Sequence, residues 1–205
     1  MDLRRSKPLE QISQIRAALA KAGAASSDYD LNPDVIPVEH GIKSPAAVLI
    51  ALIEREGALH VILTKRAQHL RHHPGQIAFP GGKVESSDAS VEVASLREAQ
   101  EEIGLAPESV EVFGALPEHV TVTGFAVKPI LGVVRGPFEP LLDKGEVEEI
   151  IFAPLAHLLD PAKYTIQERL FLGAVRKYYT IPYGPHYIWG ATARMTLGLA
   201  ERISL

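Results

Sequence analysis

A short acidic segment carries the residues whose types and spacing could do chemistry. Residues 97–105 read REAQEEIGL, which places Glu98, Glu101 and Glu102 at positions i, i+3 and i+4. A helix brings those positions to one face, where three like charges repel one another. A divalent cation removes that repulsion, because hard cations such as Mg²⁺ bind carboxylate oxygens together with substrate phosphates. The spacing therefore favours a metal site, with a solvated acidic helix face as the ordinary alternative.

The residues before and after this segment predict a glycine-rich loop, a helix and a stop. Residues 79–82 read Phe-Pro-Gly-Gly, and paired glycines allow a tight turn and the close approach of a ligand. Residues 86–90 offer serine and aspartate side chains as N-caps for the helix that follows. Gly104 fits the end of that helix. The acidic cluster then lies in the last turns, where the helix dipole disfavours negative charge, and this again favours a bound cation.

The segment from Gly82 to Leu105 resembles the signature of the Nudix hydrolase superfamily. In that signature Gly precedes Glu by six positions, and an Arg-Glu-apolar-x-Glu-Glu-x-Gly-apolar run follows. The run matches residue for residue from Arg97 onwards, but Asp88 stands in place of the Glu, and one additional residue separates it from Arg97. The resemblance implies that Arg97 belongs to the catalytic group and orients Asp88 or another carboxylate of the segment through a forked ion pair.

A second motif precedes the first and narrows the resemblance to coenzyme A pyrophosphatases. Residues 62–82 read ILTKRAQHLRHHPGQIAFPGG. The elements that match the motif of these enzymes are Leu63-Thr64, Arg66, Arg71, Gly75 and Phe79-Pro80-Gly81-Gly82. Segments 121–125 and 188–193 are similar to further parts of the same enzymes, so the resemblance extends over roughly residues 45–200.

The resemblance implies a hydrolase that cleaves coenzyme A or acyl-CoA into 3′,5′-ADP and a 4′-phosphopantetheine species. The implied cofactor is Mg²⁺ or Mn²⁺, held by Glu98, Glu101 and Glu102. A divalent metal screens the charge of a pyrophosphate and lowers the pKa of a bound water, whose proton a carboxylate can take. In Nudix enzymes that base comes either from the acidic helix or from a distant loop. The candidates for a distant base are Glu146, Glu148 and Glu149.

Basic residues before the glycine-rich turn are the expected contacts of the substrate. Coenzyme A carries a 3′-phosphate and a pyrophosphate, and cationic side chains near the catalytic loop suit both groups. His69, His72 and His73 are expected at the surface rather than as metal ligands. For Trp189, packing in the core is the commoner use, and stacking on an adenine is the alternative. The expected substrate-binding residues are Lys65, Arg66, Arg71, Gly81 and Gly82.

Two other functions stay open at this level. The acidic segment also fits a Nudix hydrolase of ADP-ribose, NADH, a dinucleoside polyphosphate or a nucleoside triphosphate. A ligand-binding module that keeps the fold without turnover is the second alternative, and the intact glutamate trio argues against it. A purely structural protein would leave an acidic cluster beside a glycine-rich loop without a purpose.

Composition and charge indicate a globular protein with a small-molecule substrate. The chain has 205 residues, of which 46% are hydrophobic and 22% charged, and its net charge is −4. This length favours a single domain over residues 1–205, and the charge provides no basic field for nucleic acid or an anionic membrane. The absence of cysteine excludes disulfides and thiolate metal sites. Because no signal peptide or apolar run of membrane-spanning length is seen, we expect a cytoplasmic enzyme, with a homodimer left open.

The elements that must position these residues follow from hydrophobic periodicity. Alternating strands and helices predict an α/β protein, and the resemblance implies the Nudix α/β/α sandwich with a mixed central sheet. Besides the acidic helix, helices are expected over residues 9–22, 155–159 and 190–203, and residues 23–44 form an extended lead-in. A loop is expected over 132–143. Strands are expected over residues 46–53, 59–64, 76–79, 110–116, 120–122, 126–134, 147–152 and 178–182.

Overall fold

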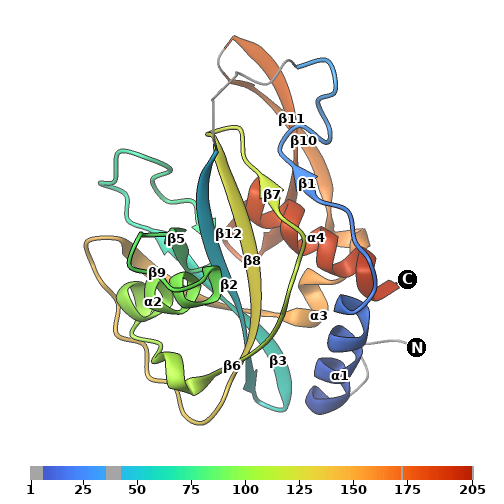
Figure 1. Cartoon of the computed structure of the whole chain (residues 1–205). Helices are drawn as coiled ribbons and strands as arrows, with labels where there is room; N and C mark the ends of the chain where they lie inside the picture. The colour runs from blue at the N-terminus through green and yellow to red at the C-terminus, as the bar shows by residue number, and fades with distance from the viewer. Residues whose placement is uncertain (1–6, 36–42, 172, 205) are drawn as a thin grey trace.

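Residues 7–35, 43–171 and 173–204 are described by the computed structural model of the chain. Over these ranges, helices pack on both sides of a nine-stranded sheet, and a three-stranded antiparallel sheet adjoins it (Figure 1). The expected α/β/α sandwich with a mixed central sheet is therefore confirmed. The small second sheet is an addition that the sequence did not predict.

Two long strands form the centre of the large sheet. They are β2 (Ser44–Arg55) and β3 (Ala58–Arg66), joined by a tight turn in which Glu56 and Gly57 both have positive φ. β2 also pairs in parallel with β8 (Phe125–Val134), and this pairing makes the sheet mixed. Apolar residues occupy both faces of these strands, as expected where helices cover both sides of a sheet.

Shorter strands extend this centre on both sides. In the described residues they are β1 (Ser26–Ser27), β4 (Ile77–Ala78), β5 (Gly81–Lys83), β6 (Val110–Ala115), β7 (His119–Val120) and β9 (Val147–Pro154). β4 and β9 pair with β3, and β5 pairs with β2. β6 and β7 pair with β8, and β1 pairs with β7. The glycine-rich β5 and the acidic end of β9 therefore lie near the centre of the sheet.

One helix covers one face of the sheet, and the remaining helices lie on the opposite side (Figure 1). α2 (Val91–Ile103) packs Ala99 and Ile103 against Leu49 of β2 and Ile62 of β3. On the other face a second buried cluster joins β2 and β3 to three helices. These helices are α1 (Pro8–Leu19), α3 (Leu155–Leu158) and α4 (Ala191–Ser204). The two short 3-10 turns are η2 (Pro107–Ser109) and η3 (Pro161–Lys163).

The ends of α2 are fixed as the sequence predicts. Ser90 has extended backbone, and its Oγ accepts a hydrogen bond of 3.2 Å from the backbone N–H of Val93. Gly104 ends the helix with φ of 71°, a left-handed conformation that glycine adopts without steric cost. The three glutamates therefore do lie in the last turns of a well-capped helix.

The small sheet consists of β10 (Thr165–Phe171), β11 (Ala174–Tyr183) and β12 (His186–Trp189). Of these three strands, only residues 178–182 of β11 were predicted. Ile166 and Leu170 of β10 are 54% and 72% exposed, so no buried face marks this strand in the sequence. Cross-strand pairing with β11 holds β10 in place instead.

Several predicted boundaries were wrong by a few residues. The first helix ends at Leu19 rather than at residue 22, and β8 continues to Val134, so the predicted loop over 132–143 begins later. The predicted strand over 120–122 is replaced by β7 and a turn at residues 121–124. The lead-in over 23–44 contains β1, and its residues 36–42 lie outside the described ranges. None of the described helices is long and apolar enough to cross a membrane.

Candidate active site

The glycine-rich strand β5 lies against the acidic face of α2. The backbone N–H of Gly81 donates a hydrogen bond of 3.3 Å to Oε2 of Glu102. At Gly82, an added Cβ would lie 2.5 Å from the carboxylate carbon of Glu98. Glycine at position 82 leaves room for that carboxylate, whereas at Gly81 an added Cβ would meet the carbonyl of Ala47 and the side chain of Val48 in β2.

Arg97 holds the acidic residues together through a forked ion pair. Its Nε and Nη2 donate to the two carboxylate oxygens of Asp88, each at 3.0 Å. Its Nη1 donates to Glu98 at 3.1 Å and to Glu101 at 3.0 Å, and Nη2 also reaches the carbonyl of Lys83. The side chain of Asp88 is only 3% exposed, and its hydrogen bonds with Arg97 lower its pKa. The additional residue between Asp88 and Arg97 therefore does not prevent the expected pairing.

Two of the three glutamates are difficult to ionise in the absence of a cation. Burial raises the pKa of Glu102 to about 8, although Gly81 and Arg66 lower it, and the charges of Glu98 and Glu146 raise it further. Burial also raises the pKa of Glu98, while its hydrogen bond with Arg97 opposes the change. A positive charge between these carboxylates would favour their ionised forms.

A divalent cation fits this arrangement through Glu98 and Glu102. Both carboxylates are partly or fully buried and lie at the glycine-lined surface of β5, where the missing side chain of Gly82 leaves space. Glu101 differs, because its side chain is 59% exposed and is bound to Arg97. In the described residues, no three acidic or histidine side chains already converge as a metal-binding group. Only one of its oxygens, Oε2, is bonded to Arg97.

The three candidates for a distant base have different surroundings in the structure. Glu146 is near enough to Glu98 and Glu102 to raise the pKa of both. Its loop is held in place because the backbone N–H of Asp143 donates to the carbonyl of Glu102. By contrast, Glu148 and Glu149 pair with other groups, at 2.7 Å from Lys65 and 3.5 Å from His186. The geometry thus favours Glu146 over the other two as a distant base.

The predicted basic residues also divide into two groups. The guanidinium of Arg66 lies 4.0 Å from the carboxylate of Glu102, and both Arg66 and Arg71 line a cavity beside the acidic cluster. Lys65 instead donates to Glu148, so its ammonium group is directed away from Glu102. Arg66 is therefore placed directly between the acidic cluster and the cavity.

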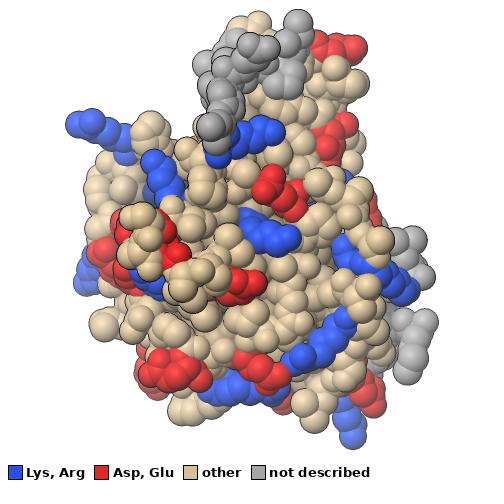
Figure 2. All heavy atoms as spheres, viewed as in Figure 1, with Lys and Arg blue, Asp and Glu red and all other residues tan. Residues whose placement is uncertain are grey.

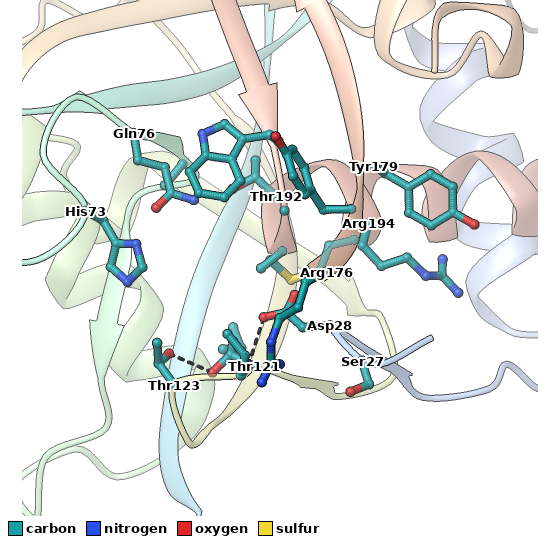
Figure 3. Close-up of a pocket in the computed structure, with 18 of the residues that line it drawn as sticks. Ser27, Asp28, His73, Gln76, Thr121, Thr123, Arg176, Tyr179, Thr192 and Arg194 are labelled. Carbon is teal, nitrogen blue, oxygen red and sulfur yellow. Dashed lines mark hydrogen bonds between the residues drawn. The ribbon is translucent and has the colours of Figure 1, made fainter. Parts of the chain in front are cut away.

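The cavity has a volume of about 710 Å³ and a predominantly basic lining. It lies between the loop before β4, the N-terminal segment, the turn after β7, and the small sheet (Figure 3). The acidic residues in its described lining are Asp28 and Asp30. The basic residues in the same lining are Arg66, Arg71, Arg169, Arg176, Lys177 and Arg194. A cavity of this size and charge suits an anionic ligand with an apolar or aromatic part.

Several residues of the cavity wall were not predicted, because they come together from distant parts of the chain. His119 is buried and joins Ser26, at 2.9 Å from Nδ1, to Asp28, at 3.1 Å from Nε2. Asp28 also accepts a hydrogen bond of 2.9 Å from the backbone N–H of Val122. This network fixes the N-terminal segment against β7. It could not be predicted from local spacing, because its residues lie far apart in the sequence. Trp189 lines the cavity rather than the core.

The surface view shows the charges of the acidic site. In Figure 2, acidic side chains gather where α2 and β5 lie in Figure 1. The buried Glu102 contributes little to that surface, because its side chain is 5% exposed.

A family model and two curated relatives each match more than half of the chain. The model of the NUDIX domain family matches residues 43–172. The "Uncharacterized Nudix hydrolase NudL" of Enterobacter sp. strain 638 is 42% identical over 163 residues, which cover 78% of this chain and 83% of that protein. The protein of the same name from Salmonella paratyphi B is 40% identical over 160 residues, with the same coverage.

Solved structures of Nudix proteins also resemble this chain. A Nudix hydrolase from M. smegmatis, RenU, shares 24% identity with a TM-score of 0.47, over 55% of this chain and 71% of that one. A MutT/nudix family protein from Enterococcus faecalis shares 16% identity with a TM-score of 0.49, over 84% of this chain and 66% of that one.

The matched family and the arrangement of α2 and β5 identify the class of protein. The chain belongs to the Nudix family and is a Nudix hydrolase, that is, a pyrophosphohydrolase. A nucleotide derivative is a substrate that fits this family, whose enzymes typically use divalent metal ions. The NudL relatives carry no substrate in their names, so the particular substrate must be argued from the site.

Proposed function

We propose that this hydrolase cleaves the pyrophosphate bond of coenzyme A or an acyl-CoA, with Mg²⁺ or Mn²⁺ as cofactor. The products are 3′,5′-ADP and 4′-phosphopantetheine or its acyl derivative. One observation carries the proposal: the motif over residues 62–82 packs directly against the acidic helix. Its Gly81 donates to Glu102, and its Arg66 lies 4.0 Å from the same carboxylate. The motif that resembles coenzyme A pyrophosphatases thus supplies the wall of the catalytic site.

In this proposal Glu98 and Glu102 would hold the metal, with Glu101 as the third ligand. The metal, when bound, screens the charge of the pyrophosphate and makes a water more acidic. Arg97 orients Asp88, Glu98 and Glu101 through the hydrogen bonds described above, so it acts as a positioning residue. Such supporting contacts are important because they fix the ligands before the metal arrives.

Glu146 is the general base in the proposed mechanism. It is exposed, it lies near Glu98 and Glu102, and its backbone N–H donates to the carbonyl of Asp143 in the loop between β8 and β9. An exposed carboxylate remains available to take the proton of the attacking water, whereas the buried glutamates are better suited to bind a cation. Arg66, whose guanidinium lies 4.0 Å from Glu102, offsets the charge of the pyrophosphate.

A Nudix hydrolase of ADP-ribose, NADH or a dinucleoside polyphosphate is the rival proposal. The acidic helix fits these substrates equally well. The excess of basic over acidic residues in the described cavity lining favours a substrate with an additional phosphate, and this favours coenzyme A over ADP-ribose.

A substrate panel tests the proposal. Coenzyme A, acetyl-CoA, ADP-ribose, NADH, diadenosine polyphosphates and nucleoside triphosphates are each incubated with the protein, in Mg²⁺, in Mn²⁺ and in chelator. We expect metal-dependent release of 3′,5′-ADP, with kcat/KM highest for coenzyme A or its acyl derivative. A higher kcat/KM for any other member would keep the hydrolase chemistry and reject the proposed substrate.

A further inference from the structure

The turn over residues 143–146, which carries Glu146, is closed by the polar groups of Asp143. The carboxylate of Asp143 accepts a hydrogen bond of 2.8 Å from the backbone N–H of Gly145. Its carbonyl accepts hydrogen bonds from the backbone N–H groups of Glu146, at 3.0 Å, and of Val147, at 2.8 Å. Aspartate commonly closes a turn in this way, because its short side chain reaches the backbone two residues further on. The backbone of Glu146 is therefore fixed relative to Asp143.

One end of this turn is attached to the helix that bears the acidic cluster. The backbone N–H of Asp143 donates to the carbonyl of Glu102, and that of Leu141 donates to the carbonyl of Ile103, each at 3.0 Å. Carbonyls in the last turn of a helix have no partner within the helix, so these bonds satisfy groups that α2 leaves open. The turn is thus held by the backbone of Glu102, whose carboxylate belongs to the acidic cluster.

The other end of the turn is held by the loop before β4. The backbone N–H of Ala67 donates to the carbonyl of Glu146 at 2.8 Å. In the same loop, Nε2 of His69 lies 3.1 Å from the carbonyl oxygen of Gly145. Because a carbonyl oxygen only accepts hydrogen bonds, Nε2 carries the hydrogen and the imidazole is the donor. This bond comes from a side chain, so a substitution can remove it without altering the backbone.

A β-bulge brings Glu146 to this loop. The register of β3 and β9 shifts by one residue before Arg66, which pairs with Val147 and leaves Glu148 as an additional residue of β9. In an unbroken register, Ala67 would lie opposite Val147 rather than beside Glu146. Bulges often redirect a side chain next to an active site. The bulge therefore sets which residue of the turn the loop before β4 can hold.

The electrostatic effect of Glu146 shows where its side chain lies. Its charge raises the pKa of both Glu98 and Glu102, so its carboxylate is on the side of the acidic cluster. Glu146 is exposed, and packing against neighbouring side chains does not hold it there. The hydrogen bonds of the turn therefore decide how close this carboxylate stays to the cluster.

We propose that His69 is a positioning residue of the hydrolysis: by donating to the carbonyl of Gly145, it keeps the carboxylate of Glu146 beside the acidic cluster. The described lining of the cavity includes Arg71 and His73 of the same loop but not His69, so the substrate need not touch His69. A misplaced base slows the chemical step and leaves binding intact. The proposal rests on the proposed function, because it takes Glu146 as the general base.

Single variants test this role through kcat and KM. His69→Phe keeps a ring of similar size without the donor, so kcat should fall about tenfold while KM changes by less than about twofold. His69→Gln places an amide nitrogen at about the position of Nε2 and should recover most of the kcat. Because His69 is exposed, the melting temperatures of both variants should match that of the wild type.

His60→Phe is the matched control for the loss of a histidine ring. Nδ1 of His60 also bonds to a backbone carbonyl, that of Ala58 at 3.2 Å, but at the opposite end of β3 from Arg66. Its kcat and KM should both equal those of the wild type. A rise in KM without a fall in kcat for His69→Phe would contradict the proposal, because it would assign His69 to substrate binding.

A double-mutant cycle separates positioning of the base from a general structural effect. Glu146→Gln removes the proposed base, and its kcat should fall about 10²-fold or more. In the Glu146→Gln background, His69→Phe should cost nothing further, because no base is left to position. A full additional loss of about tenfold in that background would overturn the proposal.

The cycle is measured with the member of the substrate panel that has the highest kcat/KM. If that member is neither coenzyme A nor an acyl-CoA, the proposed substrate fails while the cycle still tests His69. A normal kcat for Glu146→Gln would reject the proposed base and the role of His69 together. A normal kcat for His69→Phe, beside a reduced kcat for Glu146→Gln, would reject the role of His69 alone.

Discussion

The acidic cluster of α2 and the basic wall of the small sheet are built in opposite ways. The cluster comes from residues 82–105, where the helix period and a glycine turn bring the carboxylates together. The wall instead combines β10 and β11 with the N-terminal segment and the loop before β4. Chemistry that depends on short spacing is visible in the sequence, whereas substrate selection is assembled by the fold. The predictions below test whether the two regions act on one substrate.

Removal of the most buried carboxylate should have the largest effect. Glu102→Gln keeps the size of the side chain but removes a charge that holds the cation, so turnover should fall roughly 10³-fold or more. Steady-state rates at saturating Mg²⁺ measure the loss. Glu108→Gln, at an exposed glutamate close to α2 but outside the cluster, is the control and should retain normal turnover. Near-normal turnover by Glu102→Gln would contradict a metal-binding role.

Loss of the positioning arginine should have the next largest effect. Arg97→Gln removes the forked ion pair with Asp88 and the bonds to Glu98 and Glu101, so activity should fall about 10- to 100-fold. The apparent Kd for Mg²⁺ should rise in the same variant. Asp88→Asn should cost less, and the double variant should cost little more than Arg97→Gln alone, because the two residues act as one unit. Additive losses would show that they act separately.

Arg66→Ala should separate the two ends of the substrate site. Because Arg66 lies beside Glu102, kcat/KM should fall about tenfold for coenzyme A and for dephospho-coenzyme A alike. A loss confined to coenzyme A would instead assign the 3′-phosphate to Arg66.

The smallest expected effect is on thermal stability in chelator. The pKa of Glu102 is about 8 in the folded chain, above its ordinary value of 4.5. At pH values between 4.5 and about 8, the folded state therefore keeps a proton on Glu102 that the unfolded state loses. Its contribution to stability is complete below pH 4.5 and is lost as the pH rises through about 8. The melting temperature of the wild type should fall by several degrees more than that of Glu102→Gln between pH 5 and pH 8. Parallel pH profiles of the two proteins would refute the raised pKa.

Elements with a buried face or a strong cap were predictable from the sequence. β2 and β3 are continuous apolar runs, which predict buried strands. α2 is capped by Ser90 and Gly104, and both residue types predict helix ends. β10 was missed because Ile166 and Leu170 are exposed to solvent and its pairing with β11 depends on register. Burial guides prediction only where the strand itself is buried.

The same limit applies to the site. The pairing of Arg97 with Asp88 was predictable because the two residues are close in the sequence: Arg97 lies in α2, and Asp88 lies in the loop directly before it. The contact of Asp28 with His119 spans much of the chain, and neither residue belongs to a recognisable motif. The cross-strand meeting of Arg169 and Arg176 depends on the register of two strands, one of which had no predicted boundary. The sequence thus indicates the chemistry of the site but not the wall that holds the substrate.

Binding of coenzyme A to an inactive variant tests most directly whether one substrate spans both regions. Coenzyme A is titrated calorimetrically, in Mg²⁺, into Glu102→Gln and into Glu102→Gln combined with Arg71→Ala, which changes the lining of the cavity. We predict one bound molecule per chain for the first protein and affinity about tenfold weaker for the second. Equal affinity in the two folded proteins would contradict the claim that the acidic helix and the basic cavity hold the two ends of the same substrate.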